Sequence, residues 1–311
     1  MSHPSKDGGA FIAGDWGTTH GRLMLCDAQG KLLDTRTVPG ASEARGRFAA
    51  VFDGAVADWQ AAYGELPAAL CGMAGSTIGW LEAPYLPCPA DLTELGDALS
   101  SPRPGVFIVP GMRCTNPLGA PDVMRGEETQ LLGACELDAA VANGRQLVCL
   151  PGTHTKWASL HEGVLQEFIT APTGELFGLL CEHSVLVRDQ ATAIEHHAVD
   201  FERGLAESAH HAGALLHQVF QVRSLRMDRQ LSAEGAASWV SGLLIGADVG
   251  GALKLFDTHE AAPVYVVGAP RLIESYSRAL SRRGRKAVGI EGDRASLAGL
   301  AQVFRAQREQ A

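Results

Sequence analysis

Two short segments, one in each half of the chain, combine glycine, threonine and charged residues in an order suited to binding phosphate. The first, 11–19, ends in Asp-Trp-Gly-Thr-Thr, and the second, 150–156, has the sequence Leu-Pro-Gly-Thr-His-Thr-Lys. A backbone without Cβ can approach an anion closely while N–H and hydroxyl groups donate hydrogen bonds to it. Each segment lies between two apolar runs, which indicates a β-hairpin. The expected phosphate ligands are Gly17, Thr18, Thr19, Gly152, Thr153, His154 and Thr155, with Lys156 either a further point charge or directed to solvent.

Asp15 stands at the end of the first apolar run, beside the turn at Gly17. Mg²⁺ takes one or two carboxylates and keeps several waters, so a single aspartate in this position can hold the ion through water. The alternative is an ordinary hairpin in which Asp15 only caps a turn. The second segment favours the phosphate interpretation, because two such turns in two halves of a chain indicate two similar domains that close on a nucleotide.

Composition and charge indicate a folded protein with room for two cores. The chain has 311 residues, of which 46% are hydrophobic and 20% are charged, and this argues against disorder. The formal net charge of −9 argues against a nucleic-acid partner, because neutralising phosphates needs clustered lysine and arginine. The one basic cluster, 282–286, is expected to solvate a helix end.

The sequence favours a cytoplasmic protein without a membrane partner. Its seven cysteines are scattered and never spaced C-x-x-C, which is typical of a reduced chain. Its first nine residues are polar and lack the apolar region of a signal peptide. The longest apolar stretch, 239–256, is interrupted by Asp248 and Lys254, so we expect a soluble helix. Its glycines, spaced four apart, are expected to let another backbone or a flat ligand approach.

Hydrophobic periodicity predicts an α/β fold with strands and helices alternating in both halves. Strands are expected at 10–15, 21–27, 31–38, 68–73 and 105–109, and then at 146–150, through a hairpin to 169, at 264–267 and at 286–288. Helices are expected at 43–62, in stretches from 173 to 220, from an N-cap at Ser232 to about 256, at 271–282 and at 294–308. The expected domains are 1–122 and 123–311.

Six phrases, in order along the chain, resemble the 2-dehydro-3-deoxygalactonokinase family of the sugar-kinase, Hsp70 and actin superfamily. They are 15–19, 71–76 with 79–80, 82–85, 109–113, 124–130 and 150–157. The resemblance covers nearly the whole chain and implies two ribonuclease-H-like domains, each a βββαβα unit, with an ATP cleft between them. It also implies that ATP and Mg²⁺ are used to phosphorylate a small sugar acid, 2-dehydro-3-deoxy-D-galactonate, at its terminal 6-hydroxyl.

The adenosine site of the resembling families follows a late strand that ends in a pair of glycines. The segment 267–270, Val-Gly-Ala-Pro, stands in that place here and has only one glycine. The resemblance therefore implies that adenine contacts Gly268, where a missing side chain admits the base.

Phosphoryl transfer requires a carboxylate near the acceptor hydroxyl to orient it and accept its proton. The run 126–133 resembles the G-D-Q-x-A-x-x-G phrase of related carbohydrate kinases, whose aspartate aligns with Glu127. Glutamate is one methylene longer, so Glu128 remains a rival for the catalytic role. The alternative is that both acids only favour a helix N-terminus through its dipole, worth roughly 0.3–1 kcal/mol each.

A sugar acid also presents a carboxylate, which arginine can grip with two parallel hydrogen bonds. Arg113 and Arg125 are the candidates, and a surface position is the alternative for either. Ser76, Trp80 and Tyr85 lie in a glycine-rich segment able to line a sugar pocket, although Trp80 is equally suited to core packing.

Several alternatives stay open at the level of the sequence. The chain could phosphorylate a different sugar or sugar acid, bind nucleotide as a switch without transferring phosphate, or hydrolyse phosphate with water. The segments 72–80 and 109–113 favour the kinase, because they provide a place for an acceptor. A homo-oligomer is possible on this sequence. The histidines at 183, 196–197 and 210–211 lack metal-ligand spacing and are expected to be solvated or core residues.

Overall fold

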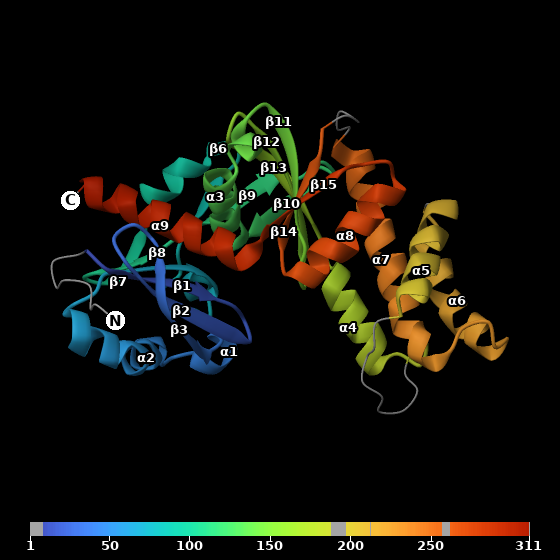
Figure 1. The fold of residues 1–311 in the computed structure, drawn as a ribbon, viewed down its shortest axis with the longest axis horizontal. Helices are drawn as coiled ribbons and strands as arrows, with labels where there is room; N and C mark the ends of the chain where they lie inside the picture. The colour runs from blue at the N-terminus through green and yellow to red at the C-terminus, as the bar shows by residue number, and fades with distance from the viewer. Residues whose placement is uncertain (1–8, 188–196, 212, 257–261, 311) are drawn as a thin grey trace. The chain divides into compact units, whose positions relative to one another are not determined.

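The computed structural model describes residues 9–187, 197–211, 213–256 and 262–310 (Figure 1). The chain forms two compact units. Unit 1 comprises Met1–Arg145, Leu160–Glu167 and Gly292–Ala311, and unit 2 comprises Gln146–Ser159 and Phe168–Glu291. The two units do not divide at residue 122, because both include more than one segment of the chain. The domain boundary expected at residue 122 stays a prediction.

Unit 1 is built on a six-stranded sheet with the order β3-β2-β1-β4-β8-β7. β1 pairs antiparallel with β2 and parallel with β4, which in turn pairs parallel with β8. The strands are β1 (Phe11–Trp16), β2 (His20–Cys26), β3 (Leu32–Pro39), β4 (Ala68–Gly72), β7 (Ser100–Arg103) and β8 (Val106–Ile108).

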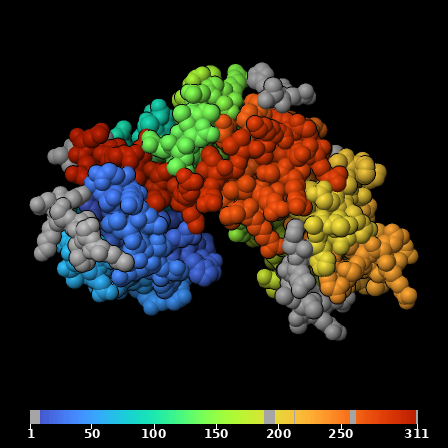
Figure 2. All heavy atoms as spheres, in the orientation of Figure 1, coloured from blue at the N-terminus to red at the C-terminus, as the bar shows by residue number. Residues whose placement is uncertain are grey.

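Alternate residues of β1 face two different helices, as the two-residue period of a strand requires. Ile12 and Trp16 pack in a core cluster with α2 (Phe48–Tyr63), whereas the ring of Phe11 stacks on Phe304 of α9 (Gly292–Gln310), with ring centroids 4.2 Å apart. Figure 1 shows these helices on opposite sides of the sheet, and in Figure 2 the red C-terminal segment lies on the blue N-terminal one. Asp15 therefore lies on the α9 side.

The rest of unit 1 consists of short elements around this sheet. A three-stranded sheet has the order β10-β9-β5, with β5 (Tyr85–Pro87), β9 (Gly111–Thr115) and β10 (Pro121–Met124). α3 (Glu127–Leu137) packs closely on α9, because Gly133 and Gly299 bring the two backbones into contact. The remaining elements are α1 (Ala41–Ala44), η1 (Met73–Gly75), β6 (Ala90–Asp91), η2 (Leu92–Gly96) and η3 (Ala139–Ala142).

A third sheet has the order β15-β14-β11-β12-β13-β6. Its strands are β11 (Arg145–Leu150), β12 (Thr155–His161), β13 (Val164–Ala171), β14 (Val264–Gly268) and β15 (Ala287–Glu291). The segment Leu160–Glu167 groups with unit 1, in which β6 pairs with β13. If the edge strand β6 is left out and the other five strands are numbered in chain order, this sheet has the order 3-2-1-4-5. The strands β3-β2-β1-β4-β8 of unit 1, numbered in the same way, have the same order.

The helices of unit 2 surround α7 (Ala233–Phe256), which contacts all four of the others. These are α4 (Thr173–His183), α5 (Ala198–His210), α6 (Leu215–Met227) and α8 (Pro270–Arg282). The glycines of α7 admit another backbone, as expected: a Cβ at Gly242 would meet α5 at Phe201, and a Cβ at Gly204 of α5 would meet α7 at Trp239. Among the described residues α7 is the one helix long and apolar enough to cross a membrane, but 67% of that stretch is buried inside the protein.

Most of the predicted elements are present, and the α/β class is confirmed. The predicted N-cap of the long helix is also confirmed, since Ser232 Oγ accepts the Gly235 N–H at 3.0 Å. The helix expected at 43–62 is present as α2 but begins later, at Phe48, because Gly46, whose φ of 74° breaks a helix, separates α2 from α1. The region 173–220 contains three helices, and its residues 188–196 and 212 lie outside the described chain.

Candidate active site

The first glycine-threonine turn is held from behind by the start of a helix. The Gly17 N–H donates to the His20 carbonyl (2.9 Å), which closes the turn between β1 and β2. The carbonyls of Gly17 and Thr18 accept hydrogen bonds from the N–H groups of Ala41 and Ser42 in α1 (3.0 and 3.1 Å). Both threonines of the turn are exposed. The tip of the turn is therefore fixed, while its hydroxyls stay open to a ligand.

A glycine allows this close packing. A Cβ at Gly40, just before α1, would meet backbone atoms of Thr18, Thr19 and His20. The helix start and the turn thus touch backbone to backbone, and a larger residue at position 40 would push them apart.

Asp15 lies at the end of β1, where α9 supports it. Asp15 Oδ2 accepts a hydrogen bond from Ser296 Oγ (2.9 Å), and Ser296 Oγ accepts one from Gln130 Nε2 of α3 (3.3 Å). Ser296 is buried, whereas Asp15 is partly exposed. The carboxylate is therefore oriented from the protein side and remains accessible to a cation. A carboxylate is the side-chain ligand that Mg²⁺ takes from a protein.

Glu127 and Glu128 are the first two residues of α3 and have different surroundings. Gly126, just before them, has a φ of 107°, a conformation that glycine adopts readily. Glu127 is partly exposed, and its Oε2 accepts the Arg125 N–H (3.0 Å). Glu128 is buried: both of its carboxylate oxygens accept the Gly126 N–H (2.9 and 2.7 Å), and Thr129 Oγ1 donates to Oε1 (3.1 Å).

Burial governs ionisation beneath this helix start. It raises the pKa of Glu128 to about 8, and the neighbouring charge of Glu127 acts in the same direction. Burial also raises the pKa of the Cys71 thiol well above its usual range, with further contributions from Asp15 and Glu128. Negative charge is therefore disfavoured on the groups buried below the helix start, Glu128 and Cys71.

Arg125 and Tyr85 of the predicted sugar site lie together. The Arg125 guanidinium stands over the Tyr85 ring, 4.2 Å from its centroid, and Nε donates to the Tyr85 hydroxyl at 3.4 Å. Nη2 donates to the Ala83 carbonyl (2.8 Å), and a Cβ at Gly75 would collide with Nη1. The arginine next to Glu127 is thus held against the segment that precedes β5.

The other three predicted sugar-site residues are more dispersed. The Trp80 ring packs on the core cluster that contains Ile12, Trp16 and residues of α2. It also contacts the Arg103 guanidinium, 5.2 Å from the ring centroid. The Ser76 hydroxyl donates to a backbone carbonyl within its own turn (2.8 Å). Arg113 is exposed on β9. The partly buried Trp80 ring thus takes part in core packing, and its contact with a sugar stays a prediction.

The second glycine-threonine turn is backed in the same manner as the first. The Thr153 carbonyl accepts the Glu175 N–H of α4 (2.9 Å), and a Cβ at Gly174 would meet the backbone of Gly152 and Thr153. His154 Nε2 lies 2.9 Å from Glu175 Oε2. Thr153 and His154 are exposed, so this turn also presents a fixed backbone and open side chains.

The strand after this turn sends consecutive side chains to opposite faces. Thr155, Lys156 and Trp157 are all buried. Lys156 is 6% exposed, so it does not project into solvent, which was one of the two alternatives for it. Thr155 and Trp157 share the other face and reach a buried carboxylate on α7.

That carboxylate, Asp248, joins four elements of unit 2. Its oxygens accept hydrogen bonds from Trp157 Nε1 of β12 (2.8 Å), Thr173 Oγ1 of α4 (2.7 Å) and the Tyr276 hydroxyl of α8 (2.7 Å). Thr155 Oγ1 lies 2.9 Å from the Tyr276 hydroxyl. Burial raises the pKa of Asp248 above its usual range, although these hydrogen bonds act in the opposite direction. The sequence showed Asp248 only as a charge interrupting an apolar run.

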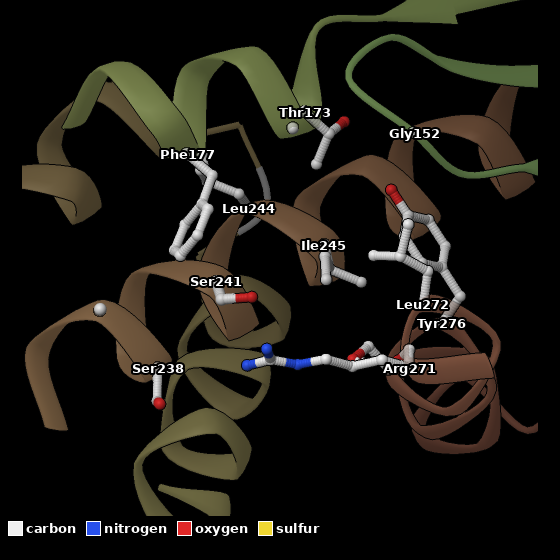
Figure 3. Close-up of a pocket in the computed structure, with 13 residues that line it drawn as sticks. Gly152, Thr173, Phe177, Ser238, Ser241, Leu244, Ile245, Arg271, Leu272 and Tyr276 are labelled. Carbon is white, nitrogen blue, oxygen red and sulfur yellow. Dashed lines mark hydrogen bonds between the residues drawn. The ribbon is translucent and has the colours of Figure 1, made fainter. Parts of the chain in front are cut away.

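A pocket of about 310 Å³ opens beside this network, between α4, α7 and α8 (Figure 3). It reaches the second turn at Gly152, and apolar side chains form much of its wall. Pockets of this size and character bind small molecules. The lining residues are Gly152, Thr173, Gly174, Phe177, Ala237, Ser238, Ser241, Leu244, Ile245, Arg271, Leu272, Ser275 and Tyr276.

Gly268 lies at the end of β14, before α8. A Cβ there would lie 3.2 to 3.4 Å from atoms of Pro151, so the strand before the second turn occupies the space next to it. The residues of α8 that line the pocket begin with Arg271. Gly268 is not among the lining residues, and its contact with adenine stays a prediction. No signal in the sequence indicated the α4, α7 and α8 side chains, which follow no motif because helix packing brings them together.

The histidines singled out in the sequence do not gather. Within the described ranges, no group of three or more His, Cys, Asp or Glu side chains could hold a metal ion. His183, His210 and His211 are exposed, and the N–H of His197 donates to Ser238 Oγ (2.9 Å). His196 lies outside the described residues.

Comparison with solved structures first defines the class. The chain shares the fold of the activator of 2-hydroxyisocaproyl-CoA dehydratase from Clostridium difficile, solved with bound ADPNP, with a TM-score of 0.50 and 11% identity over 97% of both chains. Component A of the (R)-2-hydroxyglutaryl-CoA dehydratase from Acidaminococcus fermentans gives a TM-score of 0.51 at 8% identity, covering 96% of this chain and 98% of the other. This is the actin-like ATPase fold, to which sugar kinases also belong.

Within that class, the chain belongs to the 2-keto-3-deoxy-galactonokinase family, whose model matches residues 15–303. It is 33% identical to the 2-dehydro-3-deoxygalactonokinase of Escherichia coli K12 over 300 residues, which cover 95% of this chain and 98% of the relative. A crystal structure from Sinorhizobium meliloti, of a protein assigned as a 2-dehydro-3-deoxygalactonokinase, gives a TM-score of 0.86 at 34% identity, covering 95% and 98% of the two chains. The protein is therefore an enzyme of the sugar-kinase class.

Proposed function

We propose that this enzyme transfers the γ-phosphate of ATP to the terminal 6-hydroxyl of 2-dehydro-3-deoxy-D-galactonate, giving the 6-phosphate. The observation that carries the proposal is the family match over residues 15–303, within which lie both glycine-threonine turns and the acidic start of α3. The acceptor is inferred from the names of the relatives, and the two turns present groups suited to binding phosphate. A cytoplasmic location and galactonate catabolism belong to the same proposal.

Glu127 is the proposed catalytic base. It is partly exposed at the N-terminus of α3 and so can meet a bound hydroxyl, whereas Glu128 is buried with a pKa raised to about 8. Glu127 would take the proton of the 6-hydroxyl as that oxygen bonds to the γ-phosphorus, while the bond from phosphorus to the bridging oxygen of ADP breaks. Glu128 would position the helix start by holding the Gly126 N–H.

Asp15 is the proposed magnesium residue. Mg²⁺ takes one or two carboxylates and otherwise water and phosphate oxygens, and Asp15 offers one partly exposed carboxylate that Ser296 orients. When bound, the ion would neutralise charge on the phosphates. Thr18 and Thr19 would donate to phosphate oxygens from the first turn.

We place the nucleoside in the pocket of unit 2. The pocket adjoins Gly152, so a nucleoside there would leave its phosphates next to the N–H and hydroxyl groups of Thr153 and His154. In unit 1, Arg125 and Arg113 are the proposed ligands of the acceptor's carboxylate, with Tyr85 beside Arg125. The duplicated domains, the cleft between them and self-association stay predictions.

A panel of acceptors assayed with Mg-ATP tests the activity. It would include 2-keto-3-deoxy acids of both epimeric series and plain aldoses, with the position of the new phosphate read by NMR. We expect phosphorylation of the galactonate derivative at its terminal carbon. Transfer only to another acceptor would replace the substrate, release of free phosphate without acceptor would indicate a hydrolase, and nucleotide binding without turnover would indicate a binding protein.

Replacing Glu127 by Gln tests the assignment of the base. We expect kcat to fall on the order of a hundredfold or more, while nucleotide affinity stays close to that of the parent enzyme. Glu128→Gln is the matched variant at the adjacent position and should retain much more activity. The opposite order of the two rates would move the catalytic role to Glu128.

A further inference from the structure

The pocket of unit 2 contains few groups that could tell one nucleobase from another. No carboxylate or carboxamide side chain is among its lining residues in the described part of the chain. A carboxylate only accepts, and a carboxamide held by its own partners presents one sense. This is how a site distinguishes the 6-amino group of adenine from the 6-oxo group of guanine. The polar lining side chains are Thr173, Ser238, Ser241, Arg271, Ser275 and Tyr276.

Most of these polar groups already have protein partners. The hydroxyls of Thr173 and Tyr276 both donate to Asp248 (2.7 Å each). The Ser275 hydroxyl donates to the carbonyl of Arg271 (3.0 Å), and Ser238 Oγ accepts the N–H of His197 (2.9 Å). These side chains therefore serve to hold the pocket wall together.

Two polar side chains remain, and neither selects between purines. The Ser241 hydroxyl has no recorded partner among the described residues, and a free hydroxyl can accept from an amino group or donate to a carbonyl by rotating. The Arg271 guanidinium carries only donors and suits an acceptor that both purines share, such as N7. The interior backbone of α7 is bonded within its helix. In the first turns of α4 and α8, the N–H groups of Glu175, Leu176, Leu272 and Ile273 already donate to backbone carbonyls.

Arg271 is placed to contact the face of a base. Its side chain extends from α8 across the pocket toward Ser241 (Figure 3). It is exposed, and within the described ranges no ion pair or hydrogen bond of its guanidinium is recorded. A guanidinium plane stacks well on aromatic rings, and every base has such a face. Phe177, Leu244 and Ile245 provide apolar wall around the same space.

We propose that this site accepts either purine, so that the enzyme uses GTP as a phosphate donor as well as ATP, with Arg271 contacting the face of the base. This rests on the proposed function, because it concerns the donor of the same reaction. The chemistry is the same with either donor: the γ-phosphoryl group moves to the 6-hydroxyl oxygen, Glu127 takes the hydroxyl proton, and ADP or GDP leaves. Shape and stacking select the base.

The direct test compares ATP, GTP, CTP and UTP at a saturating concentration of the acceptor that the panel identifies, with kcat/KM measured for each donor. We expect GTP to lie within about tenfold of ATP, since an apolar pocket cannot strongly reject an analogue of similar shape. Pyrimidine triphosphates should be poorer because they offer a smaller face for stacking. A preference for ATP over GTP of more than about a hundredfold would overturn the proposal.

Variants of the two free polar residues locate the contact. Arg271→Ala should raise KM for ATP and GTP by a similar factor, about tenfold, and leave KM for the sugar acid unchanged. Arg282→Ala is the control on the same helix, because that side chain pairs with Glu202 (2.9 Å) away from the pocket. Ser241→Ala should change the ATP-to-GTP ratio by less than about threefold. An Arg271→Ala effect on one purine alone, or a larger shift with Ser241→Ala, would contradict the assigned roles.

Binding without an acceptor separates this proposal from the proposed function. Calorimetric titration with ADP and with GDP measures the base preference even if no sugar acid is phosphorylated. Similar affinities would support purine tolerance whatever the acceptor, whereas affinity for ADP more than about a hundredfold above that for GDP would refute it. Failure of every acceptor with every triphosphate would instead refute the kinase assignment.

Discussion

The two glycine-threonine turns have the same backbone support but different charged side chains beside them. Each lies between two strands and is bonded to the first turn of a following helix: two carbonyls accept N–H groups of α1 in unit 1, and one carbonyl accepts an N–H group of α4 in unit 2. A glycine at the helix start, Gly40 or Gly174, permits this contact in both. The backbone design is therefore common to the two units, and the differences between them lie in the charges placed beside it.

Those charges differ in sign. The first turn follows the partly exposed Asp15, whereas the second precedes the buried Lys156 and carries the pair of His154 and Glu175. A carboxylate beside a phosphate-binding turn is useful only with a cation to neutralise it, and a lysine is useful without one. The comparison teaches that one turn is suited to hold metal and phosphate together, and the other to hold phosphate alone.

Asp15→Asn should give the largest effect. The amide keeps the hydrogen bond from Ser296 but loses the charge that would hold Mg²⁺. We expect kcat to fall on the order of a hundredfold or more, with a higher Mg²⁺ concentration needed for half-maximal rate. A titration of rate against Mg²⁺ measures both, and Asp27→Asn, in the next turn of the chain, is the control. An unchanged Mg²⁺ requirement would remove Asp15 from the metal site.

Adding a methyl group behind each turn should have the next largest effect. Gly174→Ala would force α4 away from the second turn and should raise KM for ATP about tenfold or more, with little change in KM for the sugar acid. Gly178→Ala is a matched control, because it lies on the same helix with open space around it. In unit 1, Gly40→Ala and Gly54→Ala form the corresponding pair. If Gly174→Ala and Gly178→Ala behaved alike, the close contact would have no functional role.

Asp248→Asn should have a moderate effect, confined to unit 2. In either orientation the amide would turn a donor toward groups that already donate to this side chain, the hydroxyls of Thr173 and Tyr276 or the indole N–H of Trp157. Leaving such groups unsatisfied costs about 1–3 kcal/mol in the free energy of unfolding. Denaturant unfolding with and without ATP, compared with surface Asp228→Asn, measures this. Equal stability of the two variants would show that the buried carboxylate is not needed.

Glu128→Gln should change chiefly the pH dependence of stability. The pKa of Glu128 is raised to about 8 in the folded protein, so between its ordinary value of 4.5 and 8 the folded state binds more protons than the unfolded state. The free energy of unfolding should therefore fall as pH rises through this range, by at most roughly 1.4 kcal/mol per pH unit. The variant should show a flatter curve, and exposed Glu94→Gln should not. Parallel curves for the parent enzyme and the variant would contradict the assignment.

Sequence patterns predicted the parts of the molecule that depend on local order. The hairpins, the buried strand 264–267 and the Ser232 cap follow periodicity or capping rules, and the structure has them. β5, β9 and β10 were not predicted, because their residues form neither an apolar run nor a clear alternation. α3 was not among the expected helices, although the alternative interpretation of Glu127 and Glu128 already placed a helix N-terminus there.

The candidate site, too, has parts that local sequence order predicts and parts that it does not. Asp15, Glu127 and the two turns stand in short continuous phrases, so the sequence identified them as candidates. The pocket of unit 2 is lined by the second turn and by three helices, and its lining residues extend from Gly152 to Tyr276 in the sequence. No local pattern specifies which faces of these helices meet. Burial likewise separates Glu128 from Glu127, which adjacent letters of the sequence cannot do.

The glycine contacts between α5 and α7 bear on how this enzyme could vary. Ser241 and Gly242 are neighbours on α7, yet the serine lines the pocket while the glycine touches α5 on another face of the helix. The wall of the pocket of unit 2 is thereby supported from its reverse side. A methyl group gained at Gly204, which lines no part of the pocket, would displace α7 from α5, so the shape of the pocket can change through residues that never line it.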